Sequence, residues 1–193
     1  MGPVAAAAYN LTFQLGFATT QICESVAVAV QTMLARELAD TTTHSPDVRR
    51  QLVRHLIQTG ILIGGGVAAL LSLTTFFQQD SVLRGLTNNA AIRASAAAIF
   101  PVVLVTQTLK GLAYPVNGIV MGGLDWFFSM MAMWLANFAC VGIVKGFALK
   151  GTLTLGQIWW ALAAFMGTQV VTGIIRYESK TGVWKVLRKE KTS

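Results

Sequence analysis

Residues 56–79 read LIQTGILIGGGVAALLSLTTFFQQ, a run without a single charged side chain. The hydrocarbon core of a bilayer is about 30 Å thick, and a helix needs about 20 apolar residues to cross it. This run is therefore long enough to span a membrane. The same reasoning identifies four more stretches, in which only Glu24 and Lys110 are charged: residues 3–35, 94–124, 126–144 and 151–175.

The composition also indicates a membrane protein. Hydrophobic residues make up 54% of the 193 residues and charged residues 12%, which is about half the charged fraction of an average soluble domain. A soluble protein would have to bury several helices that are apolar on every face, and a chain of this length cannot build so large a core. We therefore predict an all-α, polytopic membrane helix bundle with five transmembrane helices.

The expected organisation is a transmembrane bundle over residues 1–175 followed by a basic tail over residues 177–193. The predicted helices cover about 3–39, 56–79, 90–123, 126–147 and 153–176. With five spans, most of the 15 lysines and arginines fall on the side of the tail, so the positive-inside rule places the C-terminus in the cytosol or in the equivalent compartment of an organelle. A basic tail beside a membrane is expected to bind anionic lipid, and no nucleic-acid partner is expected.

The first predicted helix carries polar residues that lipid cannot satisfy. Asn10, Gln14, Gln21 and Gln31 recur at helical spacing on one face, and Glu24 falls at the edge of that face. Such a face is expected against other helices or a water-filled cavity. A carboxyl group inside the bilayer can bind a proton on one side and release it on the other, so Glu24 is the candidate for ion coupling.

The third predicted helix is also polar in its middle. Pro101 and Pro115 each remove a backbone donor and should kink or break it, and broken helices line binding sites in transporters. The candidates for lining a cavity or binding a substrate are Gln14, Gln31, Gln107, Lys110 and Asn117. In the alternative interpretation, the amides only form hydrogen bonds between helices, and Lys110 forms an ion pair with Glu24.

Small residues predict where helices approach each other closely. Gly60 and Gly64 have the spacing of a small-residue packing face, and Gly118 and Gly122 repeat that spacing in the third helix. The cysteines and histidines show no ligand spacing, so neither a metal nor a disulfide framework is expected. No intramembrane nucleophile with a neighbouring base is visible, and the chain is not expected to be an enzyme.

Residues 106–127, TQTLKGLAYPVNGIVMGGLDWF, resemble the tenth span of multidrug and toxic compound extrusion (MATE) transporters. That span has a Ser/Thr-Gln-Pro start, an apolar run, Asp-Gly, and a small-x-Asp-aromatic ending. Residues 14–40 are similar to the eighth span of the family, and residues 86–89 fall where the family has a Phe-Thr-x-Asp loop. The order and spacing of these motifs extend over the whole chain. The DNA-damage-inducible type and its plant plastid relatives are the most similar branch.

Three positions depart from the family pattern. Asn117 stands where the family usually has an acid before Gly118, and Asn89 replaces the acid of the loop. Lys110 takes a place where the plastid-type relatives tend to have Asn. These departures remove two carboxylates from the set of ion-coupling candidates.

The resemblance implies the eighth to twelfth helices of an antiporter that exports organic or xenobiotic compounds in exchange for H⁺ or Na⁺. It implies no cofactor besides the coupling ion. The implied partners are membrane lipid, small organic substrates and a missing N-terminal lobe, so the chain is expected to be a fragment of a multi-pass transporter of the plastid envelope, vacuole or plasma membrane. The alternatives are a lipid-linked oligosaccharide flippase of the same superfamily and a non-transporting membrane scaffold fragment.

Overall fold

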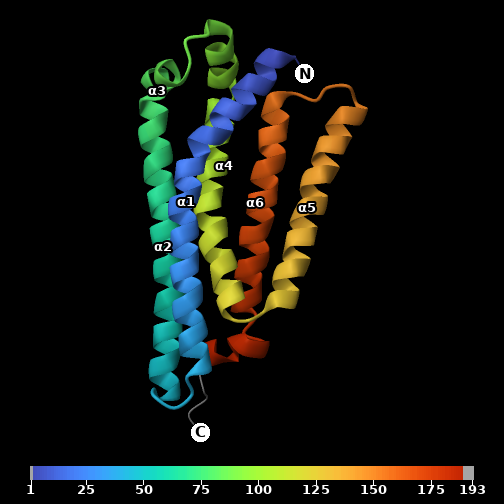
Figure 1. Cartoon of the computed structure of the whole chain (residues 1–193). Coiled ribbons are helices and arrows are strands. Elements are labelled where there is room, and N and C mark those ends of the chain that lie inside the picture. Colours follow the sequence, from blue (N-terminus) through green and yellow to red (C-terminus); the bar gives the residue numbers. More distant parts are fainter. Residues whose placement is uncertain (1, 189–193) are drawn as a thin grey trace.

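Five long helices run side by side, with a short helix near each end of the bundle (Figure 1). The computed structural model describes residues 2–188, and no strand occurs within that range. The elements are α1 (Pro3–Ala39), α2 (Pro46–Phe77), α3 (Gln79–Leu86), α4 (Ala90–Gly122), α5 (Trp126–Leu149), α6 (Leu155–Glu178) and the 3₁₀ helix η1 (Gly182–Leu187). The protein is thus a helical membrane bundle, as its composition predicted.

The prediction of five apolar spans needs a correction. Within the described residues, four helices are long and apolar enough to cross a membrane, namely α2, α4, α5 and α6. The remaining long helix, α1, has the length, but amides and Glu24 interrupt its apolar residues, and it is not among the helices that are apolar enough to span. It nevertheless packs along α4 and α2 for much of its length. The polar composition of α1 is therefore the feature that needs a functional explanation.

Pro101 and Pro115 were expected to kink or break the third helix, and the helix is not broken at either proline. Helix α4 continues from Ala90 to Gly122 and contains both Pro101 and Pro115. Pro115 leaves the carbonyl of Gly111 without its usual helical donor, and a Cβ added to Gly64 of α2 would lie only 2.5 Å from that carbonyl oxygen. The glycine thus lets the α2 backbone close over the freed carbonyl, and a neighbouring helix of this kind allows a proline inside a spanning helix.

Helix α4 is the central element, because it contacts α1, α2 and α6. Small residues bring the helices together. A Cβ at Gly118 would lie 2.5 Å from the carbonyl oxygen of Ala27, and one at Gly60 would lie 2.5 Å from Cγ2 of Val30. At Gly122 the nearest atom would be the carbonyl oxygen of Gln31, at 2.7 Å. At these three positions, only glycine permits the observed approach to α1.

Two predicted boundaries differ from the structure, namely the start of the second helix and the start of the tail. Helix α2 begins at Pro46 rather than near residue 56, because proline suits the first helical position and Asp47 places a negative charge in the first turn. In the region of the predicted tail, η1 forms over Gly182–Leu187 and buries Trp184 and Leu187. The rest of that predicted tail, residues 189–193, lies outside the described residues.

Candidate functional site

The outward side of α1 is a mixed polar and aromatic surface. Gln14, Gln21 and Glu24 are exposed along it. Phe13 and Phe17 lie among them, with 45% and 58% of their surface exposed. The opposite side of α1, which includes Ala8, Cys23 and Leu34, is buried against the bundle. We call the exposed residues Asn10, Gln14, Phe17, Gln21, Glu24 and Val28 the polar face of α1.

Lys110 does not neutralise the carboxylate of that face. The ion pairs formed within residues 2–188 are Asp47–Arg50 and Asp125–Arg176. Lys110 is 9% exposed, and its ammonium lies 5.5 Å from the centre of the Phe13 ring, where a cation–π attraction holds it. The structure therefore does not contain the Glu24–Lys110 ion pair that the alternative interpretation proposed.

Gln107 lies one turn before Lys110 and faces into the bundle. It is 4% exposed, and neither its Oε1 nor its Nε2 has a hydrogen-bond partner among the described residues. A hollow of about 20 Å³ adjoins it, lined in part by the hydroxyl-bearing residues Thr19, Ser72 and Thr75. A polar space of this size is large enough for one water molecule. The buried amide of Gln107 therefore marks a hydratable point between α1, α2 and α4.

Asn117 and Gln31 lie apart from these groups. The Nδ2 group of Asn117 donates a hydrogen bond to Oε1 of Gln169 on α6, so in this conformation it links α4 to α6. Gln31 is half-buried where α1 crosses Gly122. The candidate residues are thus divided between the polar face of α1, which holds Gln14 and Glu24, and the interior of the bundle.

One polar cluster was not assigned a role from the sequence. Arg176 of α6 donates through Nε to Oδ2 of Asp125 at 2.5 Å, and Nε1 of Trp184 donates to the same oxygen at 3.3 Å. The Arg176 guanidinium also lies 5.3 Å from the centre of the Phe128 ring. This cluster joins the α4–α5 turn to α6 and η1. Asp125 belongs to the small-x-Asp-aromatic ending of the quoted motif, which was the available signal.

The matches to known proteins cover almost the entire chain. Over 189 residues it is 27% identical to the protein DETOXIFICATION 44, chloroplastic, of Arabidopsis thaliana, which covers 96% of this chain and 34% of that protein. The chain resembles the C-terminal part of a MATE transporter. Two further proteins of that plant, DETOXIFICATION 43 and DETOXIFICATION 42, are 25% and 26% identical over 100% and 97% of this chain.

The chain spans about a third of the length of each of these MATE relatives. No family model matches the chain, and no solved structure matches it significantly. The matched region thus corresponds to the C-terminal part of these longer relatives. Within the described residues, none of the other helices covers the polar face of α1.

Proposed function

We propose that this chain is most of the C-terminal lobe of a secondary active antiporter that exports organic compounds in exchange for H⁺ or Na⁺. The observation that supports this proposal is the uncovered polar face of α1 in a bundle whose other long helices are apolar. A charged carboxylate at the centre of a spanning helix costs about 2.5–3.5 kcal/mol on insertion scales. That cost is avoided when Glu24 faces water or a second lobe instead of acyl chains.

The chemistry of the face fits organic substrates that have both aromatic and polar parts. Phe17 and Val28 supply apolar surface, with exposed fractions of 58% and 56%. Gln14 and Gln21 supply amide donors and acceptors on the same side. Scattered amides among aromatic side chains bind molecules of varied shape, because few contacts require one fixed geometry.

The charges of α1 favour an antiporter over a lipid-linked oligosaccharide flippase. Residues 3–35 contain Glu24 and no lysine or arginine, and Lys110 lies buried beneath Phe13 rather than on the polar face. A flippase of this kind is expected to have a more cationic cavity, with exposed cations that bind the headgroup of the lipid. A surface with one carboxylate suits neutral and cationic compounds and offers one proton-binding group.

Localisation and topology follow from the same proposal. The missing partner is the N-terminal lobe, which would cover the polar face of α1 and complete a central cavity. The C-terminal end lies in the cytosol or stroma, since most of the cations are found on that side. The membrane is the plastid envelope, the vacuolar membrane or the plasma membrane.

Export of ethidium from energised vesicles tests the proposal. The chain is expressed alone and together with the N-terminal two thirds of DETOXIFICATION 44, and proton-driven export is expected only in the second case. Glu24→Gln should abolish the export. The control Asp80→Asn, which changes an exposed carboxylate in the first turn of α3, should leave the export unchanged. Absence of export in both arrangements contradicts the antiporter, and undiminished export by Glu24→Gln removes that carboxylate from the mechanism.

A further inference from the structure

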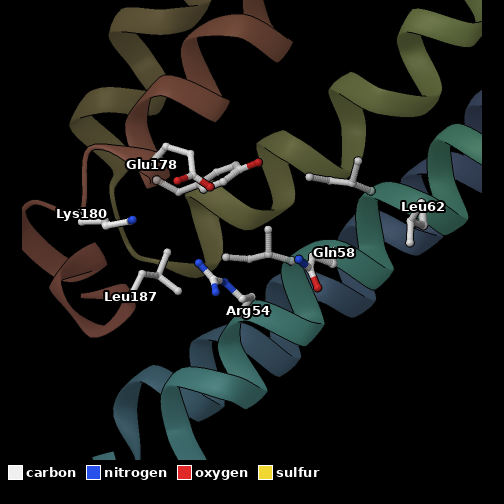
Figure 2. A pocket seen from close by; sticks show the side chains of 9 residues that line it. Arg54, Gln58, Leu62, Glu178, Lys180 and Leu187 are labelled. Carbon is white, nitrogen blue, oxygen red and sulfur yellow. The ribbon is translucent and has the colours of Figure 1, made fainter. Parts of the chain in front are cut away.

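An elongated groove opens where α2 meets the C-terminal end of α6 and η1. One part of it has a volume of about 590 Å³ and is lined by Ile57, Ile61 and Leu62 of α2 and by Tyr177 of α6. Its other lining residues include Arg54, Glu178, Lys180 and Leu187. Figure 2 shows Arg54 reaching from α2 toward the facing segment that carries Lys180 and Leu187. The groove thus has an apolar wall along α2 and a charged end.

A second hollow, of about 520 Å³, continues from the charged end. It shares Arg54, Lys180 and Leu187 with the first and adds Arg50 and Arg188 to the lining. The shared residues make the two hollows one continuous groove. Across both parts, four cationic side chains oppose one carboxylate, that of Glu178. The groove therefore attracts anions.

Arg54 and Lys180 remain available to a ligand. Arg50 forms an ion pair with Asp47 at 2.9 Å and donates to the carbonyl oxygen of Arg188 at 3.4 Å. Within residues 2–188, neither Arg54 nor Lys180 takes part in an ion pair. Like charges on facing walls repel each other, and an anion between them relieves that repulsion.

The backbone at Lys180 supports a role for its side chain. Lys180 has a φ of 52°, the left-handed conformation that glycine adopts most easily after a helix. A lysine in this conformation costs free energy relative to glycine. In this conformation Lys180 lines both parts of the groove.

The depth of the groove matches a lipid headgroup. Arg54 lies two residues before the uncharged run that begins at Leu56, and Lys180 lies two residues after the end of α6 at Glu178. Both cations therefore lie at the same membrane surface, where phospholipid phosphates are found. Leu62, 72% exposed, lies two turns deeper along α2, at the level of the acyl chains. Basic pockets between helices at this depth bind anionic lipid headgroups.

We propose that this groove binds one anionic phospholipid. Its phosphate lies between Arg54 and Lys180, and one acyl chain follows Ile57, Ile61 and Leu62 along α2. The site lies at the end of the bundle and does not include the polar face of α1, so it stands independently of the transport proposal.

The test is a lipid titration of the full chain, purified in detergent and followed by native mass spectrometry. Phosphatidylglycerol and phosphatidylcholine with identical acyl chains are compared, with sn-glycerol 3-phosphate as a headgroup without chains. The wild type should retain phosphatidylglycerol preferentially and bind glycerol phosphate weakly. Arg54→Gln combined with Lys180→Gln should weaken phosphatidylglycerol binding roughly thirty-fold, since each cation at a membrane surface contributes a factor of about five.

The matched control is Lys145→Gln combined with Lys150→Gln. It removes two exposed cations from the opposite end of the bundle and should leave the titration unchanged. Equal retention of both lipids, an equal loss in the control variant, or equally strong binding of glycerol phosphate overturns the proposal. If the double variant loses its helical circular dichroism, Lys180→Gln alone decides, with an expected five-fold loss.

Discussion

Replacing Asp125 by Asn should destabilise the lobe by about 2 kcal/mol. The carboxylate accepts from Arg176 at 2.5 Å and from Trp184 at 3.3 Å, and its side chain is 14% exposed, against 24% for Arg176. Hydrogen bonds to charged groups contribute about 1.5–3 kcal/mol each. The isosteric amide retains a weaker acceptor, and Arg176 keeps its bond to Thr181 at 2.9 Å, so the expected loss lies in the lower part of this range.

The assay is unfolding by sodium dodecyl sulfate in mixed micelles, followed by far-ultraviolet circular dichroism. Asp47→Asn is the matched control, because the Asp47–Arg50 pair has a similar distance of 2.9 Å but leaves the aspartate 74% exposed. Exposed pairs contribute about 0–1 kcal/mol. A double-mutant cycle with Arg176→Gln should give a coupling energy above about 1 kcal/mol. Equal effects of Asp125→Asn and Asp47→Asn, or zero coupling to Arg176, refute the reasoning.

The remaining predictions use the same unfolding assay. Gly118→Ala should lower the free energy of unfolding by about 1–3 kcal/mol by overpacking α1 against α4. The control Gly142→Ala, where a Cβ meets nothing within 4 Å, should be neutral or stabilising. A similar loss at both sites contradicts the packing. Gln107→Met removes an unpartnered buried amide and should not destabilise the lobe. Asn117→Leu should lower the stability by about 1–3 kcal/mol, because the acceptor Oε1 of Gln169 loses its donor. A larger loss for Gln107→Met than for Asn117→Leu would contradict the structure. Hydrogen bonds from Thr43 and Thr42 lower the pKa of the Asp40 carboxyl below its ordinary value. The ionised carboxyl therefore stabilises the fold above about pH 4, and this stabilisation is lost as the pH falls further. Asp40→Asn should reduce the loss of stability on acidification, and an unchanged loss argues against that role.

Local sequence patterns were sufficient to predict the five long helices, but not α3 or η1. An uncharged run such as residues 56–79 has few stable alternatives to a spanning helix. The spacing also predicted a shared face on α1 formed by Asn10, Gln14, Gln21 and Gln31, with Glu24 at its edge. Gln31 is half-buried, whereas the other four residues are exposed. What this spacing could not reveal is which residues of other helices lie near that face. Lys110, which was a candidate partner for Glu24, instead packs its ammonium against the ring of Phe13.

The features that the sequence did not predict depend on contacts with residues far away in the chain. Pro115 predicted a kink or a break, but α4 continues through it, and Gly64 of α2 packs against the carbonyl that the proline frees. Asp125 and Arg176 are far apart in sequence and meet only because α5 and α6 pack side by side. Such pairs depend on the tertiary arrangement, which the residues near either partner do not specify.

The central claim is that the polar face of α1 borders a water-accessible path, and cysteine accessibility tests it most directly. In a background with Cys23→Ala and Cys140→Ala, single cysteines replace Gln14, Glu24 or Leu70. Leu70 is the lipid-facing control on α2, with 65% of its surface exposed. Membranes containing the chain and the N-terminal two thirds of DETOXIFICATION 44 are treated with a charged, membrane-impermeant thiol reagent. Rapid labelling at positions 14 and 24 and slow labelling at position 70 are the predicted result, whereas equally slow labelling at all three positions contradicts the claim.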